Sequence, residues 1–171
     1  MEGIIMKPIY LVGFMGAGKT TIGKLLSDYL NISFFDTDQV IEKKIRLSIP
    51  EIFQKYGEQF FRKLEKEVVE SLPSQNVVVS TGGGMMAIDE IRDYLLQQGI
   101  VIFLQCDFHS LYERIRYDKT RPLVNNRSKD ELHALYEKRL PFYQLATHTI
   151  QTTHLTEKET VDKILNVLNF S

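Results

Sequence analysis

Eight residues near the beginning of the chain have types and spacing that suit the binding of a phosphate group. Residues 13–20 read G-x-x-x-x-G-K-T, follow the apolar run at residues 9–12 and precede a helical pattern. Glycines let successive N–H groups point at phosphate oxygens, and the helix that follows adds the positive end of its dipole. Lys19 is expected to reach the β- and γ-phosphates, and Thr20 to ligate Mg²⁺. The expected nucleotide contacts are Gly13, Gly16, Ala17, Gly18, Lys19, Thr20 and Thr21.

A pair of acidic residues follows a second apolar run. Residues 32–35 predict a short strand, and Asp36 and Asp38 come just after it. Mg²⁺ prefers oxygen ligands, so Asp36 is placed to hold the metal together with Thr20, directly or through a water molecule. Asp38 could face a second substrate, where it would accept a hydroxyl proton or orient the hydroxyl toward the γ-phosphate. Alternatively, one of the two aspartates only caps the next helix.

Three consecutive glycines follow a third apolar run. Gly82, Gly83 and Gly84 come after the β-branched residues 76–80. Glycines leave backbone N–H groups unshielded and let a ligand approach closely, whereas a turn alone rarely needs more than one or two of them. The run therefore indicates a second contact with a ligand.

Arginines supply the remaining candidates. Four of the eight arginines lie in or beside residues 118–127, which we expect to form a long mobile loop around Arg121 and Pro122. An arginine on a closing lid would stabilise charge on the transferring phosphoryl group and exclude water. Arg62 and Arg139 fall on predicted helices, where spacing alone also allows ordinary exposed charges. The four arginines in or beside this segment are Arg114, Arg116, Arg121 and Arg127.

Buried strands alternate with helices along the chain. This pattern predicts an α/β fold with a doubly wound sheet of about five parallel strands, formed by a single domain over residues 1–171. Ligands bind at the carboxyl ends of such strands, so the three segments described above should lie along one rim. Strands are expected at residues 9–12, 32–35, 76–80, 100–104 and 148–152, and helices at 22–30, 39–45, 58–72, 88–98, 111–117 and 128–146, with capping boxes opening others at Ser48 and Thr156.

The composition is that of an ordinary globular chain. The 171 residues are 43% hydrophobic and 25% charged, and the net charge of −1 argues against nucleic acid as a partner. No apolar run approaches the roughly 18 residues of a membrane span. The single Cys106 cannot form an intrachain disulfide, and no charged-then-apolar leader opens the chain. We therefore expect a cytoplasmic protein, and we expect it to be a monomer.

Six motifs in order give the chain an end-to-end resemblance to the shikimate kinase family, small P-loop enzymes of the nucleoside monophosphate kinase type. The resemblance implies phosphorylation of the 3-hydroxyl of shikimate by ATP, with Mg²⁺, in aromatic amino-acid biosynthesis. The motifs are G-F-M-G-A-G-K-T at residues 13–20, D-T-D at 36–38, G-E-Q-F-F-R at 57–62, T-G-G-G at 81–84, T-R-P-L at 120–123 and R-L-P-F-Y at 139–143.

The resemblance also implies roles for single residues. Arg62 and Arg139 would pair with the carboxylate of shikimate, a role that suits the planar guanidinium group. Arg121 would be the lid arginine on the ATP phosphates, and Arg114 would stack near the adenine. Shikimate would be held by Asp38, Arg62, Gly82, Gly83, Gly84 and Arg139, and the catalytic residues would be Lys19, Asp38 and Arg121.

The same resemblance implies a helical substrate-binding region at about residues 37–72 and a mobile lid at about residues 116–127. Family members close the adenine pocket before the last helix, but the match at residues 151–156 is weak and we assign no residue there. Ser80 and Thr81 follow the third strand where many P-loop enzymes have an acidic metal ligand. The expected metal ligands are therefore Thr20 and Asp36.

Other functions fit parts of the pattern. Another small-metabolite kinase, such as a gluconate kinase, would use the same scaffold. A nucleoside monophosphate kinase fits less well, because the glycine run and Asp38 suit a polyhydroxylated ring. A GTP-dependent switch or regulatory module would have no use for the arginines, and the guanine-reading N-K-x-D motif is absent.

Overall fold

Five parallel strands form the centre of the molecule, in the order β2-β3-β1-β4-β5. A computed structural model of the chain describes residues 5–118, 124 and 126–170. The strands are β1 (Ile9–Val12), β2 (Ser33–Asp36), β3 (Val77–Ser80), β4 (Ile100–Gln105) and β5 (His148–Gln151). The helices are α1 (Lys19–Leu30), α2 (Thr37–Ile45), α3 (Ile49–Ser71), the 3₁₀ turn η1 (Met85–Ala87), α4 (Asp89–Gln98), α5 (Phe108–Ile115), α7 (Lys129–Tyr143) and α8 (Glu157–Val167). The predicted α/β fold with a doubly wound parallel sheet is confirmed.

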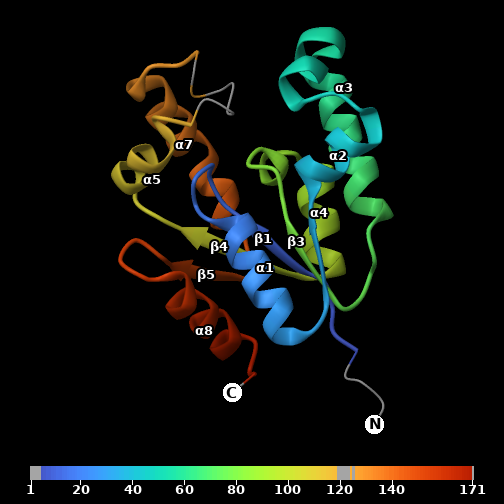
Figure 1. Cartoon of the computed structure of the whole chain (residues 1–171), viewed down its shortest axis with the longest axis vertical. Coiled ribbons are helices and arrows are strands. Elements are labelled where there is room, and N and C mark those ends of the chain that lie inside the picture. Colours follow the sequence, from blue (N-terminus) through green and yellow to red (C-terminus); the bar gives the residue numbers. More distant parts are fainter. Residues whose placement is uncertain (1–4, 119–123, 125, 171) are drawn as a thin grey trace.

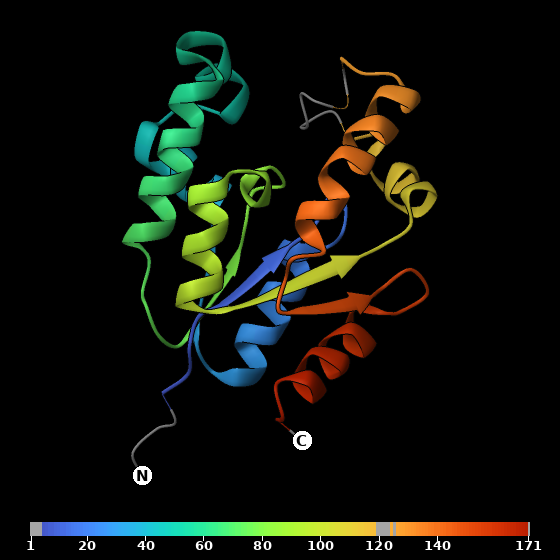
Figure 2. The ribbon, with the colours of Figure 1, turned by 180° about the vertical axis from the view of Figure 1, so that it is seen from behind.

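The central strands are buried because helices cover both faces of the sheet. Every residue of β1 and β3 is buried, as expected for strands that read as continuous apolar runs. Helices α1 and α8 lie on one face, and α4 and α7 lie on the other (Figures 1 and 2). This arrangement leaves the carboxyl ends of the strands open toward the loops.

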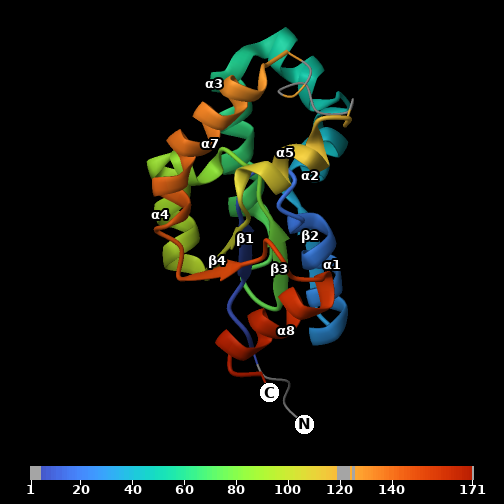
Figure 3. The ribbon, with the colours of Figure 1, turned by 90° about the vertical axis from the view of Figure 1, so that its left-hand side faces the viewer.

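Helices α2 and α3 rise beyond the sheet, as Figure 3 shows for α3 at the top of the molecule. They share a small core of their own, separate from the main one. Gly57 interrupts α3 with φ 82° and ψ 175°, so the helix predicted at residues 58–72 is the second half of a longer, kinked helix. The small core consists of Ile41, Ile52, Phe61, Leu64 and Val68.

Three helices begin two or three residues earlier than predicted: α1, which follows Gly18, and α2 and α5, which an aspartate caps. Helix α2 begins two residues early, and Asp36 Oδ1 accepts a hydrogen bond from the N–H of Gln39 at 3.2 Å. Helix α5 begins three residues early, and Asp107 Oδ1 accepts from the N–H of Ser110 at 2.9 Å. Such caps satisfy N–H groups that the first helical turn leaves unpaired. Of the two aspartates that follow the second apolar run, Asp36 and Asp38, it is therefore Asp36 that caps the next helix. Asp36 also lies at the predicted metal site. The η1 turn was not predicted, and α7 ends before the expected residue 146.

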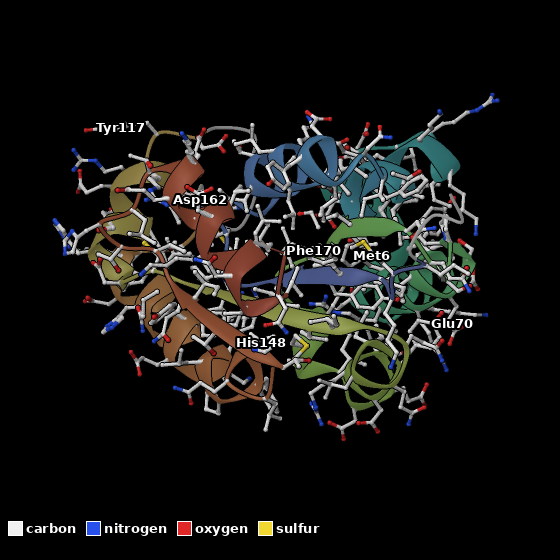
Figure 4. The ribbon with its side chains drawn as sticks, turned by 90° about the horizontal axis from the view of Figure 1, so that it is seen from below. Met6, Glu70, Tyr117, His148, Asp162 and Phe170 are labelled. Carbon is white, nitrogen blue, oxygen red and sulfur yellow. The ribbon has the colours of Figure 1, made fainter. Side chains whose placement is uncertain are left out.

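The segments next to both termini lie at the lower end of Figure 1. Figure 4 views this end, with Met6, which precedes β1, and Phe170, which follows α8, near the centre. Both side chains pack against the main core, and Asn76 Oδ1 accepts a hydrogen bond from the N–H of Met6 at 2.9 Å. Among the helices of the described residues, none has the length and apolar character needed to span a membrane.

Candidate active site

A cavity of about 990 Å³ opens at the carboxyl ends of β1, β2 and β3. The loop after β1, the aspartates after β2 and the glycines after β3 all line it, which confirms the predicted common rim. Candidates that line the cavity are Gly16, Gly18, Lys19, Thr20, Thr21, Asp36, Asp38, Arg62, Gly82, Gly83, Gly84 and Arg139.

The loop after β1 has a backbone conformation that favours glycine. Gly16 and Gly18 have φ values of 81° and 89°, in the left-handed region. Gly18 is also the N-cap of α1, so the loop ends at the positive end of a helix dipole. Lys19 Nζ donates to the carbonyl of Gly13 at 2.7 Å and to that of Phe14 at 3.1 Å. These features together make an anion-binding loop.

Three oxygen-bearing side chains meet behind this loop. Thr20 Oγ1 donates a 2.6 Å hydrogen bond to Asp36 Oδ2, and Ser80 Oγ lies 3.5 Å from Thr20 Oγ1. Hydroxyl and carboxylate oxygens are the ligands that Mg²⁺ accepts in proteins, usually with several waters retained. The chemistry of this donor set therefore fits the metal that an ATP-dependent kinase uses. Ser80 lies at the end of β3, where the sequence has no acidic residue that could serve as a metal ligand.

The glycines of the run 82–84 face four charged groups, two at Gly82 and one at each of the others. No side chain larger than hydrogen fits there unless its neighbours move. A Cβ would stand 2.7 Å from Glu65 Oε1 and 3.2 Å from Asp38 Oδ1 if built on Gly82, 3.3 Å from Arg139 Nη1 on Gly83, and 2.7 Å from Arg62 Nη1 on Gly84. The turn thus gathers two carboxylates and two guanidinium groups around backbone that carries no side chain.

Glu65 is a buried carboxyl group in this cluster, with a side chain only 1% exposed. Its Oε2 accepts a 2.7 Å hydrogen bond from Nη1 of Arg62, the residue one helical turn earlier on α3. Burial raises the pKa of Glu65 to about 7, against the opposing effect of Arg62, and the charge of Asp38 adds to the rise. Arg139 also faces this carboxyl group and favours its ionised form. Glu65 therefore lines the cavity with a pKa near neutral pH.

Other candidates lie beside the cavity or outside the described residues. Gly13 and Ala17 belong to the phosphate loop without lining the cavity. Arg114 Nη1 donates to the carbonyl of Gly16 at 3.1 Å, which places this arginine against the loop. Arg121, the predicted lid arginine, lies outside the described residues, as does part of the predicted lid at 116–127. Arg127, near the end of that segment, lines the cavity.

Three residues of the site were missed in the sequence. Glu65 occupies a core position of α3, four residues after Phe61 and three before Val68, so a charge at an apolar position was its signal. Thr37 Oγ1 accepts a hydrogen bond from the N–H of Gly82 at 3.0 Å. Tyr143 donates its hydroxyl hydrogen to the carbonyl of Gly83 at 2.6 Å. Neither of these two contacts has a signal in local sequence.

Comparison with known proteins gives consistent matches over nearly the whole chain. A family model described as shikimate kinase matches residues 15–169. A shikimate kinase of Bacillus mycoides is 43% identical over 164 residues, which cover 96% of this chain and 99% of that protein. The structure of shikimate kinase from Acinetobacter baumannii in complex with shikimate has a TM-score of 0.91 at 38% identity, covering 96% of this chain and 93% of that one. The shikimate kinase structure from Aquifex aeolicus has a TM-score of 0.84 at 41% identity, covering 95% and 96%. The chain therefore belongs to the shikimate kinase family.

Proposed function

We propose that this chain transfers the γ-phosphoryl group of ATP to the 3-hydroxyl of shikimate inside the cavity at the carboxyl ends of β1, β2 and β3. Shikimate kinase activity and the use of ATP follow from membership of the family. This membership decides against the gluconate kinase, the nucleoside monophosphate kinase and the regulatory module that the sequence left open.

One observation carries the proposal: an anion-binding loop and a cluster of carboxylates and guanidinium groups line the same cavity. The loop, with Lys19 at its end, suits the phosphates of ATP. Arg62 and Arg139 suit a carboxylate, because a guanidinium group can donate two parallel hydrogen bonds to it. The Acinetobacter baumannii relative was solved as a complex with shikimate, which carries such a carboxylate.

Asp38 is the proposed partner of the reacting hydroxyl group. Its carboxylate faces Gly82 beside Glu65, on the same rim as Lys19. From there it would orient the 3-hydroxyl toward the γ-phosphate and accept its proton as the new P–O bond forms and the bond to ADP breaks. Lys19 and Arg121 would neutralise charge on the transferring group. Positioning and charge neutralisation would supply most of the rate, as expected for a loose phosphoryl-transfer transition state.

Thr20 and Asp36 would hold the metal, and Ser80 lies close enough to add an oxygen through a water molecule. When bound, Mg²⁺ supplies charge neutralisation at the β- and γ-phosphate oxygens. Asp36 serves two purposes here, since it also caps α2, the helix on which Asp38 lies. The metal site and the proposed acceptor site are therefore joined by one short segment of chain.

The proposal also covers parts of the molecule away from the reacting atoms. Residues 37–72 would form the substrate-binding region, and residues 116–127 would form a lid that delivers Arg121. Arg114, held at the loop by its contact with Gly16, would lie near the adenine. We further propose a monomer in the cytoplasm. Size-exclusion chromatography with light scattering tests the monomer, since a dimer would double the measured mass.

An ADP-coupled kinase assay with a panel of acceptors tests the proposed function. We expect ADP formation that depends on shikimate and stays at background with gluconate or nucleoside monophosphates. Phosphorus and proton NMR of the product should show a phosphate ester on the 3-oxygen. Two variants at one position test whether Arg139 binds the carboxylate of shikimate. Arg139→Ala should raise the KM for shikimate by about a hundredfold. Arg139→Lys, which keeps the charge but cannot donate two parallel hydrogen bonds, should raise it by about tenfold. Turnover of gluconate in place of shikimate, or an ester on another oxygen, would refute the proposal.

A further inference from the structure

The glycine turn at residues 82–84 is held from two sides by hydroxyl groups of distant residues. On one side, the fully buried Thr37 accepts a hydrogen bond from the N–H of Gly82 at 3.0 Å. On the other side, Tyr143 at the end of α7 donates to the carbonyl of Gly83 at 2.6 Å. Both hydroxyl groups bond to backbone, so they fix the orientation of peptide groups.

The contact with Tyr143 determines where the next N–H points. The chain has no cis peptide bond among the described residues, so each carbonyl and the N–H that follows it point in opposite directions. Because the carbonyl of Gly83 points at Tyr143, the N–H of Gly84 points away from that helix. In the same way, the carbonyl of Gly82 accepts from the N–H of Met85 at 3.1 Å, which directs the N–H of Gly83 outward from the turn.

These two N–H groups are available for a ligand. Within the described part of the chain, neither the N–H of Gly83 nor that of Gly84 donates to another protein group. Both glycines line the cavity, beside the guanidinium groups of Arg139 and Arg62 respectively. Two backbone donors beside two guanidinium groups form a site for anionic or hydroxyl oxygens.

We propose that Tyr143 is a positioning residue for the acceptor substrate, which it does not touch: by fixing the carbonyl of Gly83, it aims the N–H groups of the glycine turn at the substrate's oxygens. Thr37 does the same from the opposite side. This inference rests on the proposed function, since it takes shikimate as the molecule in the cavity.

The surroundings of Tyr143 make it a firm support. Its side chain is 1% exposed and its ring lies against Phe103 of β4, with ring centroids 5.1 Å apart. Burial raises its pKa to about 12, so the phenol keeps the hydrogen that it donates. Arg139 precedes it by one helical turn on α7. One turn of helix therefore carries both a proposed ligand of the carboxylate and the support of the backbone donors.

Helix α7 offers a matched control. Tyr136 lies two turns before Tyr143, is buried, and donates its hydroxyl hydrogen to the carbonyl of Cys106 at 3.1 Å. Tyr136→Phe removes a buried hydroxyl bonded to the carbonyl of Cys106. Tyr143→Phe removes a buried hydroxyl bonded to the carbonyl of Gly83, and this hydroxyl also interacts with the side chain of Arg139. The two variants should therefore lose similar stability, but only one of them should disturb the glycine turn.

Steady-state kinetics separate the two variants. We expect Tyr143→Phe to raise the KM for shikimate by about tenfold, because the N–H groups of the glycine turn would no longer be aligned with the substrate's oxygens. The KM for ATP should change by less than about twofold. For Tyr136→Phe, neither KM should change by more than about twofold. An unchanged shikimate KM in Tyr143→Phe, or equal increases in both variants, would overturn the inference. At the second support, Thr37→Val should raise the same KM, and Thr37→Ser, which retains the oxygen, should restore it.

Amide NMR makes the test independent of the substrate's identity. In ¹H–¹⁵N spectra without ligand, the Gly84 amide of Tyr143→Phe should shift and exchange faster with solvent, whereas Tyr136→Phe should leave it in place. Adding shikimate to the wild type should shift the Gly83 and Gly84 amides. If the turn responds to Tyr143→Phe but shikimate leaves both amides unmoved, the proposed function fails at this site while the support by Tyr143 stands. If Tyr143→Phe leaves the Gly84 amide unchanged, the support itself is disproved.

Discussion

Thr20 Oγ1 donates a 2.6 Å hydrogen bond to Asp36 Oδ2 beyond the carboxyl end of β3. Thr20 follows β1 and Asp36 ends β2, and β3 lies between these strands in the sheet. Ser80, the last residue of β3, fills the gap with its hydroxyl 3.5 Å from that of Thr20. The ends of β2 and β3 and the first turn of α1 therefore present oxygens at one point, which supports the proposed metal site.

The first prediction concerns this proposed metal site. Asp36→Asn should raise the Mg²⁺ concentration that gives half-maximal activity by about tenfold, because an amide is a weaker ligand than a carboxylate. Asparagine caps helices as well as aspartate, so the free energy of unfolding should change little. Magnesium titrations of kinase activity and urea unfolding measure the two effects. Asp36→Ala is the companion variant and should in addition lose about 1 kcal/mol of stability with the cap. Equal magnesium requirements in the wild type and Asp36→Asn would argue against the metal assignment.

The second prediction concerns Asp38. Asp38→Asn keeps the size of the side chain but removes its ability to accept a proton, so kcat should fall by about a hundredfold or more. The dissociation constant for ATP should change by less than about threefold, since the loop that binds phosphates is untouched. Single-turnover kinetics and calorimetric titration with ATP measure these quantities. Near-normal turnover would mean that Asp38 neither accepts the proton nor orients the hydroxyl.

The sheet and its rim were predictable because they depend on patterns local in sequence. The three central strands β1, β3 and β4 are buried apolar runs, whereas the edge strands β2 and β5 are partly exposed. Parallel strands necessarily bring their carboxyl ends together. The position of Asp38 and of Gly82 on that rim follows from where their strands end. Helix boundaries were less predictable, because the sequence alone does not show whether an aspartate before a helix caps it, as Asp36 and Asp107 do.

The supports of the site were not predictable because they depend on packing between distant segments. Tyr143 and Gly83 are 60 residues apart, and Thr37 and Gly82 are 45 apart. In the sequence, a buried tyrosine at a helix end resembles any core residue. Glu65 is the exception, because a charge at an apolar helical position marks either a buried ion pair or a functional group.

The third prediction concerns the space around Gly84. A Cβ at this position would stand 2.7 Å from Arg62 Nη1 and 2.8 Å from Nη2, so Gly84→Ala should push the guanidinium group aside. The KM for shikimate should rise by about tenfold or more, and the KM for ATP should stay within about twofold. Gly57→Ala is a contrasting variant, because a Cβ there meets nothing within 4 Å but Gly57 has φ 82°. It should lower the melting temperature through backbone strain in α3. If Gly84→Ala binds shikimate normally, Arg62 does not act from its observed position.

The last prediction concerns Glu65 and pH. Its pKa rises from an ordinary value of 4.5 to about 7 through burial, and Asp38, Arg62 and Arg139 are the charged groups that face it. Below about pH 4.5 the carboxyl group is protonated in both the folded and the unfolded chain, so its titration does not change the free energy of unfolding. Between about pH 4.5 and pH 7, Glu65 ionises in the unfolded chain but not in the folded one, and this ionisation favours unfolding. The folded state should therefore lose stability as pH rises toward 7, by up to about 3 kcal/mol.

Glu65→Gln isolates this effect, because glutamine has the shape of the protonated acid and does not ionise. The stability of this variant relative to the wild type should increase from about pH 5 to about pH 8, as measured by urea unfolding. Glu67→Gln is the control on the same helix, since Glu67 is exposed and pairs with Lys44 at 3.5 Å; its difference from the wild type should stay constant. An anionic substrate beside Glu65 should also favour its protonated form, so binding of shikimate near pH 7 should take up protons. Calorimetry in buffers of different ionisation enthalpy would detect this uptake in the wild type and its loss in Glu65→Gln. Parallel stability profiles together with no proton uptake would show that Glu65 stays ionised throughout, paired with Arg62.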